Sequence, residues 1–445
     1  MRSLQRLSIF LLIATSPFSC LHYKTPALPG SRQPQFTDDG AWCWFSDPRA
    51  IYYHTASGTQ VISGWVKADG TIEAGALNLA SRTVQTATLQ DTLEKDDHDN
   101  PAFVQLADGS ILAHYTKHGT GKYYQNKTNT AGQVKSFSPT DTIDMIDPAE
   151  YTRYPKKTIT YGNPVRLAAE HNRLYSFGRW TGYKPNIMWS NDNGKNWSTA
   201  KVMITNPGPF NPDNRPYVKY FSDGQSRIHI VFTDGHPRNE PTNSVYYAYY
   251  ENGNFYKADG TKICAIDALP FVPGQASVVY QATEKLGKAW VFDIAATESG
   301  NPVIAYTRYP TDQDHRYHYA VFDGKTWVDH EICASGKWFP KTPAGKKEPE
   351  PNYSGGLALH PTKSNTVYLS RSINGVFEIE KRVTQDNGAS WKIYPITQKS
   401  IFDNVRPYVP RNYKKGDKDV VCWMQNVQYI HYLNFKSNIR YYIEE

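Results

Sequence analysis

The chain has 445 residues, a formal net charge of +7 and an aromatic content of 14%, including 32 tyrosines and 11 tryptophans. Long apolar patterns with helical spacing are absent, which excludes a helical bundle and favours many short strands joined by tight turns. The positive charge suits an anionic partner, but it is not gathered in a basic tail or recognition helix, which argues against nucleic acid. Composition therefore indicates an all-β protein whose partner is an acidic carbohydrate.

The N-terminus predicts an export signal over residues 1–20. A basic start precedes an apolar core, residues 7–15, that is too short to span a bilayer. Cys20 is a candidate for lipidation, and the proline-containing residues 21–36 are expected to form a linker. We therefore expect an exported protein that does not span the membrane: secreted, periplasmic, or held at the cell surface through a lipid on Cys20.

Two histidines bracket a predicted hairpin. The apolar runs 102–104 and 111–115 flank an Asp-Gly turn at 108–109, His98 precedes the first run, and His118 follows the second. Because a hairpin brings its open ends together, the two imidazoles should lie side by side and form a candidate proton-handling site. The ordinary alternative is a pair of loop histidines on a solvated rim.

Two segments repeat closely. Residues 190–197 and 384–391 both fit the pattern S/T-x-D-x-G-x-x-W, and residues 323–327 form a truncated copy. The aspartate can accept from backbone N–H groups of a turn, the glycine takes a positive φ, and the tryptophan packs beneath. The pattern resembles the Asp-box, or BNR, turn of β-propeller blades, which indicates the architecture and says nothing about catalysis.

Looser repeats place a proline before an apolar strand start at intervals of roughly fifty residues, as expected for four-stranded blades. They predict a seven-bladed β-propeller over residues 37–445. The last strand, within 429–442, is expected to pair with the first blade and close the ring, which removes exposed edges. The approximate blades are 37–90, 91–155, 156–207, 208–270, 271–340, 341–398 and 399–445.

The innermost strands of a propeller begin at one end of its central channel, so the side chains there should share one mouth. Several are basic or aromatic, which describes a cationic, aromatic-lined cleft, although each taken singly is more often structural. The candidate substrate-binding residues at this mouth are Arg49, Asn100, Asn163, Arg215, Tyr217 and His236.

Five stretches together resemble a known group. Residues 40–50, the two histidines twenty positions apart, and residues 160–165, 177–179 and 215–220 are similar to the BNR-repeat ulvan lyases of polysaccharide lyase family 25, related to family 24. The resemblance runs from about residue 37 to the end. It implies a seven-bladed propeller, here expected to be a monomer, that cleaves ulvan, a sulfated rhamnose–uronic acid polymer, by β-elimination at glucuronate or iduronate.

The resemblance also implies a catalytic set, which maps onto His98, His118, Tyr161 and Arg179. In β-elimination a base takes the C5 proton beside the uronate carboxylate, and Arg179 would neutralise that carboxylate. Tyr161 would be the base, kept as phenolate by Arg179, and the reverse assignment, a histidine base with Tyr161 as the acid, stays open.

No cofactor is required for this reaction, and no catalytic metal is expected. A structural zinc site is conceivable across the hairpin around residues 323–324, although ordinary strand residues are the favoured interpretation. Its four side chains would be His315, His318, His330 and Cys333.

Two other classes of function stay open. A propeller glycoside hydrolase of sialidase or rhamnosidase type would need carboxylates at the site, for which Asp47, Asp97 and Asp99 are candidates. A non-catalytic glycan-binding protein at the cell surface would keep the aromatic, basic cleft without needing the histidine, tyrosine and arginine set.

Overall fold

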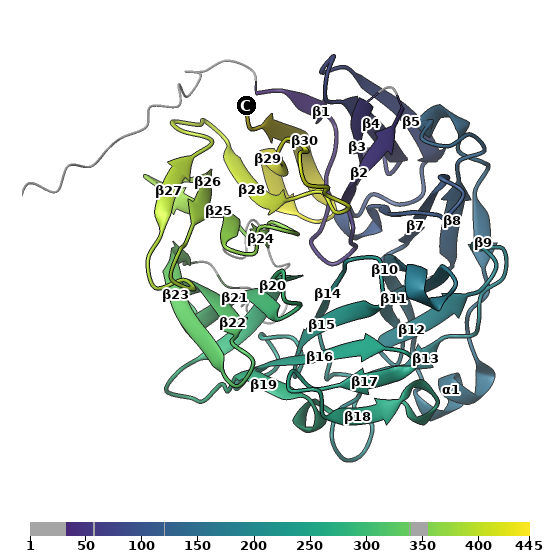
Figure 1. Ribbon diagram of the computed structural model, residues 1–445, viewed down its shortest axis with the longest axis vertical. Coiled ribbons are helices and arrows are strands. Elements are labelled where there is room, and N and C mark those ends of the chain that lie inside the picture. The colour runs from purple at the N-terminus through teal and green to yellow at the C-terminus, as the bar shows by residue number, and fades with distance from the viewer. Residues whose placement is uncertain (1–32, 57, 120, 338, 340–354) are drawn as a thin grey trace, which may run out of the picture.

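The computed structural model describes residues 33–56, 58–119, 121–337, 339 and 355–445. Seven β-sheets stand around a central axis, so the predicted seven-bladed propeller is confirmed (Figure 1). The predicted export signal with Cys20, and the linker as far as residue 32, lie outside the described residues. Within the described part, no helix has the length and apolarity to cross a membrane.

Each blade is a set of antiparallel strands that begins at the centre of the ring and ends at its rim. Blades one to three contain β2 (Ala50–Thr55), β3 (Gly58–Val66), β4 (Ile72–Asn78) and β5 (Val84–Gln90); β6 (Ala102–Gln105), β7 (Ile111–Thr116), β8 (Tyr123–Lys127) and β9 (Asp141–Ile143); and β10 (Lys157–Leu167), β11 (Arg173–Thr181), β12 (Pro185–Ser190) and β13 (Lys201–Val202). The short helix α1 (Pro148–Arg153) lies between blades two and three.

The remaining four blades follow the same order, and blade four carries two extra strands. They contain β14 (Val218–Ser222), β15 (Arg227–Thr233), β16 (Val245–Glu251), β17 (Asn254–Tyr256), β18 (Lys262–Ala265) and β19 (Ser277–Tyr280); β20 (Lys288–Ala296), β21 (Pro302–Thr311), β22 (Asp314–Phe322) and β23 (Trp327–Gly336); β24 (Leu357–Leu359), β25 (Thr366–Ile373), β26 (Val376–Val383) and β27 (Lys392–Pro395); and β28 (Asp403–Tyr408), β29 (Val420–His431) and β30 (Asn434–Ile443).

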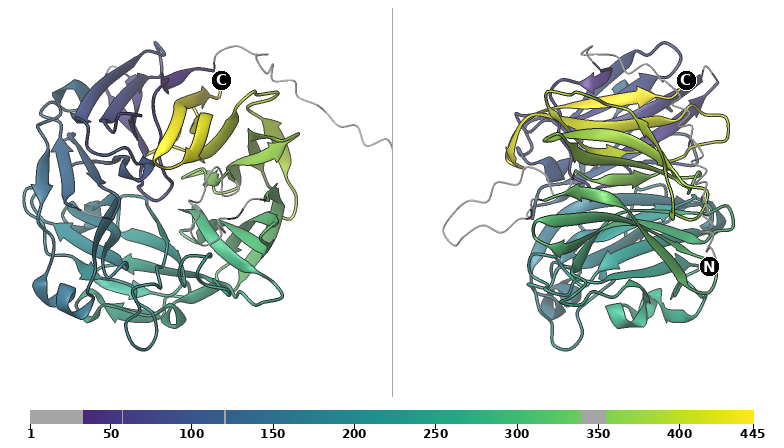
Figure 2. Two further views of the ribbon diagram at one scale, coloured as in Figure 1. Left: turned by 180° about the vertical axis from the view of Figure 1, so that it is seen from behind. Right: turned by 90° about the vertical axis from the view of Figure 1, so that its left-hand side faces the viewer.

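The two ends of the propeller chain close the ring together. The strand β1 (Gln35–Thr37) pairs with β30 and so supplies the outermost strand of blade seven, rather than a strand of blade one. The first and last strands lie side by side in every view (Figure 2). The sheet of blade seven thus begins at Gln35, within residues 21–36, which were expected to form a linker. The pairing of β1 with β30 joins the two ends of the propeller chain and closes the ring.

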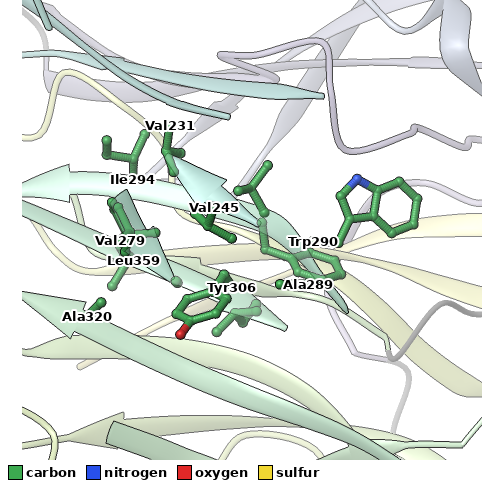
Figure 3. Close-up of a cluster of buried hydrophobic side chains, with 14 of the residues drawn as sticks. Val231, Val245, Val279, Ala289, Trp290, Ile294, Tyr306, Ala320 and Leu359 are labelled. Atoms are coloured by element: carbon green, nitrogen blue, oxygen red, sulfur yellow. The ribbon is translucent and has the colours of Figure 1, made fainter. Parts of the chain in front are cut away.

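The blades are held to one another by apolar layers between neighbouring sheets. Figure 3 shows the largest layer, in which Val231 and Val245 of blade four face Ala289 and Ile294 of blade five. The alternation of inward and outward side chains in each strand makes this packing possible, because one face of every sheet meets the next blade.

The two full Asp-box repeats form the turns that the sequence predicts. In the first, Asp192 Oδ1 accepts from the backbone N–H of Asn196 at 2.9 Å, and Trp197 Nε1 donates to the Gly194 carbonyl at 3.2 Å. The second repeat has the same contacts around Asp386. Both turns join the third and fourth strands of a blade, β12–β13 and β26–β27.

A connecting segment fills the centre of the ring. Residues 41–49, here called the plug segment, run from β1 in blade seven to β2 in blade one and lie across the central axis (Figure 1). Their backbone groups bond to five different blades. The partners are Gly64 and Val66 of blade one, Asp97 and Asn100 of blade two, Asn163 of blade three, Lys219 of blade four and Arg406 of blade seven.

Buried ion pairs surround the plug segment. Asp47 bonds to Arg49 and Lys219, Asp97 bonds to Arg406, and Asp293 bonds to Arg411 with 2.5 Å between Oδ1 and Nη2. In the last of these pairs both side chains are less than a tenth exposed. Such pairs cost desolvation, but removing one partner leaves a charge buried without compensation.

Arg411→Met is therefore expected to lower the free energy of unfolding by about 3–5 kcal/mol, because Asp293 would stay buried without its cation. The control is Arg316→Met, which removes an ion pair with Asp314 that is more than a third exposed and is expected to cost about 1 kcal/mol or less. Urea unfolding of both variants checks this. Equal losses would contradict the role given to the central pairs.

Candidate active site

The two predicted histidines meet at the central end of blade two. His98 lies in a 3-10 turn (Asp97–Asp99) before β6, and His118 follows β7. Their rings stack, with 3.9 Å between centroids and 14° between planes. The hairpin prediction is thus confirmed, and the structure places the two imidazoles side by side.

Tyr161 reaches the same place through an irregularity in β10. Its backbone is left-handed, with φ at 70°, in a bulge where β10 loses register with β11. The Tyr161 N–H donates to Thr116 Oγ1 at 3.0 Å, and its carbonyl accepts from Trp180 Nε1 at 3.0 Å. Gly178 is required opposite, because a Cβ there would lie 2.4 Å from the Tyr161 carbonyl oxygen. The bulge aims the phenol at His98, with 5.9 Å between ring centroids.

Arg179 stands in β11 beside Tyr161. Its guanidinium carbon lies 5.1 Å from the Tyr161 ring centroid and 5.3 Å from that of Tyr217, and Nη1 donates to Tyr217 Oη at 2.8 Å. The residue is only 6% exposed, its Nε has no hydrogen-bond partner, and no carboxylate of the described residues lies within ion-pair distance. Burying a guanidinium without a counter-ion is costly, so this position suits a carboxylate that arrives with a ligand.

Aromatic side chains form the walls around Arg179. Phe45 of the plug segment packs on Tyr217, with 4.7 Å between centroids, and on Tyr161 at 5.8 Å. A small cavity of about 20 Å³ lies between these rings and Arg179. A larger cavity, about 640 Å³, is lined by Asp47 and Pro48 of the plug segment and by none of the residues predicted for a lyase site.

The predicted residues of blade four extend the site. Tyr217 precedes β14, and His236 follows β15, with 5.2 Å between their ring centroids. Arg215 stacks on Tyr183, its guanidinium carbon 4.0 Å from the ring centroid, and its side chain is 31% exposed. The structure thus brings Arg215, Tyr217 and His236 to the site that holds Arg179.

Three of the predicted substrate-binding residues have structural roles. Arg49 and Asn100 are buried, and their polar groups bond to the plug segment and to Asp47. Asn163 is also buried and lines the small cavity, but its side chain bonds to the Asp47 N–H and the Phe177 carbonyl. All three side chains thus have partners within the protein, and contact of Arg49, Asn100 or Asn163 with a substrate stays a prediction.

Burial decides the protonation of the central groups. It raises the pKa of Tyr161 well above its ordinary value, although Arg179 works in the opposite direction. The expectation that Arg179 keeps Tyr161 as phenolate is therefore wrong in the unliganded site. Burial, together with the neighbouring His98, lowers the pKa of His118 to about 4, so that its imidazole is neutral at pH 7.

Within the described part of the chain, one group of side chains has ligand atoms close enough together to hold a metal ion. Asp96, His98 and His118 each offer a ligand atom, and these atoms lie within 4.8 Å of one another. Both Asp96 oxygens already accept from the two imidazoles, so the group is satisfied without an ion.

The four residues considered for a zinc site do not converge. In the register of β22 and β23, His318 stands opposite Glu331, and Tyr319 stands opposite His330. His318 Nδ1 instead contacts Asp329 at 3.1 Å. The structure thus does not support the conceivable zinc site.

Four residues at the site were missed by sequence reasoning. Asp96 bridges the histidines, Tyr432 lies edge-on to both rings, Phe45 forms the floor, and Tyr183 carries Arg215. The only feature of the sequence that could have indicated Asp96 is its position in a run of acidic residues beside His98. Tyr432 comes from the β29–β30 hairpin, more than three hundred positions away, and no local pattern announces it.

The fold and site define a seven-bladed propeller with a stacked histidine pair, a phenol and a buried arginine at one mouth of its channel. Residues 61–334 match the sequence profile of the BNR repeat-containing family, and the chain belongs to that family. No curated protein matches the sequence.

Solved structures of polysaccharide lyases are similar in fold. An ulvan lyase of family PL25, bound to -[GlcA(1-4)Rha3S]-, gives a TM-score of 0.70 at 13% identity, covering 93% of this chain and 96% of that chain. The polysaccharide lyase Uly1 gives 0.58 at 12% identity, covering 93% and 98%. At these identities the likeness establishes the fold, and the activity has to be argued from the site.

The raised pKa predicts that Tyr161 stays neutral at pH 10, the ordinary pKa of a tyrosine. Carbon-13 NMR of the tyrosine Cζ, assigned with Tyr161→Phe, measures its ionisation. Arg179→Met should raise the Tyr161 pKa further, because the guanidinium favours phenolate. Titration of Tyr161 at or below pH 10 would contradict this account of the site.

Proposed function

We propose that this protein is a polysaccharide lyase that cleaves a uronate-containing polysaccharide by β-elimination, with ulvan as the first substrate to test. The observation that carries the proposal is the buried guanidinium of Arg179, which has no carboxylate partner among the described residues and lies beside a phenol and two imidazoles. A substrate uronate would supply the missing anion.

Arg179 would bind the uronate carboxylate. Its Nε and the nitrogens not used by Tyr217 can take both oxygens in a bidentate contact. Removal of the C5 proton turns the carboxylate into an enolate-like group with more negative charge. A fixed cation in a site of low dielectric stabilises that charge more strongly than water does.

Two different groups would carry the protons. A neutral imidazole of the His98–His118 pair takes the C5 proton, because the lowered pKa of His118 leaves it unprotonated at pH 7. The C5–H electron pair forms the C4–C5 double bond, and the C4–O4 bond breaks. Tyr161, held neutral by burial, donates its proton to the departing O4. This is the assignment that sequence reasoning left open, and it replaces Tyr161 as base.

The surrounding residues fit an extended anionic chain. Arg215, stacked on Tyr183 and partly exposed, offers a cation beyond Arg179, and His236 and Tyr217 offer ring faces for a sugar. A fold shared with lyases that include one bound to a sulfated uronate fragment supports this substrate class. Export of the protein would place it with such polymers outside the cell.

The geometry gives less support to a hydrolase. Glycosidases of the usual type need two carboxyl groups flanking the bond to be cleaved. Asp47 is paired with Arg49 and Lys219, Asp97 is paired with Arg406, and Asp99 is fully buried. None of these carboxylates is presented to a ligand at the mouth that holds Arg179.

A wild-type protein acting on ulvan should therefore produce the ultraviolet absorbance of an alkene conjugated with a carboxylate. Arg179→Met is expected to lower kcat by about 10²- to 10³-fold, as for loss of one transition-state electrostatic contact. The matched control is Arg173→Met in the same strand, at the opposite end and paired with Glu170, which should leave the rate unchanged.

Appearance of reducing ends without the ultraviolet signal would favour a hydrolase. Absence of both signals on ulvan and on other uronate polymers, with binding retained, would favour the glycan-binding alternative. Equal rates in the two arginine variants would remove the argument from Arg179.

A further inference from the structure

One carboxylate holds both histidines of the site. Asp96 Oδ1 lies 2.6 Å from His98 Nδ1, and Asp96 Oδ2 lies 2.8 Å from His118 Nδ1, so each oxygen serves one ring. Asp96 is only 2% exposed, and its Oδ1 also accepts from the His98 backbone N–H at 3.0 Å. Tyr432 lies edge-on to both rings, with centroid distances of 4.9 and 5.1 Å.

This arrangement decides which nitrogen of each ring carries hydrogen. An ionised carboxylate only accepts hydrogen bonds, so both Nδ1 atoms that face Asp96 must be donors. In the neutral ring the other nitrogen, Nε2, is then a hydrogen-bond acceptor and a base. The same carboxylate therefore prepares both imidazoles in one tautomer.

The stack also limits how many protons the pair can hold. Two imidazolium rings 3.9 Å apart would repel each other, and only one carboxylate bonds to both. The other titratable or charged groups that face the pair come from several elements. They are Glu94, Asp97 and Asp99 on the same segment, Tyr161 on β10, Arg179 on β11, and Tyr432 on the β29–β30 hairpin.

We propose that Asp96 is a positioning residue that fixes His98 and His118 together as Nδ1–H tautomers, so that Nε2, and not Nδ1, is the basic nitrogen of each ring and the pair acts as a single base. The catalytic part of this inference rests on the function proposed above. The tautomeric part does not, because it follows from the contacts of both Nδ1 atoms with Asp96, to which Asp97 adds a contact with His98 Nδ1 at 3.2 Å.

Asp96→Asn tests the inference because an amide cannot replace the carboxylate. Its oxygen can accept from one Nδ1–H, but its NH2 group must donate to the other ring, which forces that ring into the Nε2–H form. Nitrogen-15 NMR of the 13 histidines, with signals assigned by His98→Gln and His118→Gln, reads the tautomers directly. The matched control is Asp108→Asn, at the turn of the same hairpin and far from the rings.

We expect both wild-type rings to be Nδ1–H at neutral pH, one ring to change tautomer in Asp96→Asn, and neither to change in Asp108→Asn. In Asp96→Asn, kcat on the uronate polymer should fall by about 10²- to 10⁴-fold, the range of a general base, with KM little changed. The acidic limb of the pH–rate profile should change in Asp96→Asn and stay in place in the control.

Wild-type rings in the Nε2–H form would overturn the inference even if the variant did not fold. Unchanged tautomers in a folded Asp96→Asn would do the same. The inference would also be overturned if zinc bound stoichiometrically and shifted both Nδ1 signals, and if zinc restored the activity of protein that a chelator had inactivated. Correct tautomers in a protein that cleaves no uronate polymer would overturn the proposed function and leave the positioning role of Asp96 in place.

Discussion

The structure depends on the plug segment, residues 41–49, which lies across the centre of the ring and bonds to five blades. A ring of sheets packs each blade only against its two neighbours, so the centre needs a separate means of fixing distant blades. Here hydrogen bonds to the plug backbone and buried pairs such as Asp47 with Lys219 meet that need. The pairs are costly to bury, but they fix the register of the blades around one axis.

The same segment makes the site possible. Phe45 places an aromatic floor under Tyr161 and Tyr217, which excludes water and lowers the local dielectric. Burial keeps the proton on Tyr161 and leaves His118 neutral at pH 7, whereas Arg179 keeps its charge although desolvation opposes it. The site thus brings together a donor, a base and a cation, the three groups that β-elimination of a uronate requires.

Much of the fold could be predicted from the sequence because its signals are local. Asp-box turns and the hairpin between His98 and His118 each depend on neighbouring residues, and both are present in the structure. The proline-led strand starts are present only in part, because Pro164 lies inside β10 and Pro407 lies inside β28. The residues of the site that come from one hairpin or one strand end were found for the same reason. The closure of the ring by β1 was not predicted, because a strand of three residues is too short to show an alternation of apolar and polar side chains.

The rest depends on contacts between distant segments. Arg49 and Asn100 were expected at the surface of the cleft because proline-led strand starts converge there, but Arg49 is a buried part of the plug segment and Asn100 bonds to that segment. The pKa of Tyr161 was expected to follow its charged neighbour, yet burial under Phe45 outweighs Arg179. The burial of these side chains depends on the path of residues 41–49, which the sequence does not reveal.

The central claim, that Arg179 awaits a uronate carboxylate, is tested most directly by calorimetry on the Tyr161→Phe variant. A uronate oligosaccharide should bind about 10- to 100-fold more tightly than the same oligosaccharide with its carboxylates reduced to alcohols, as for one charge-assisted contact. Equal affinity for the two would contradict the account.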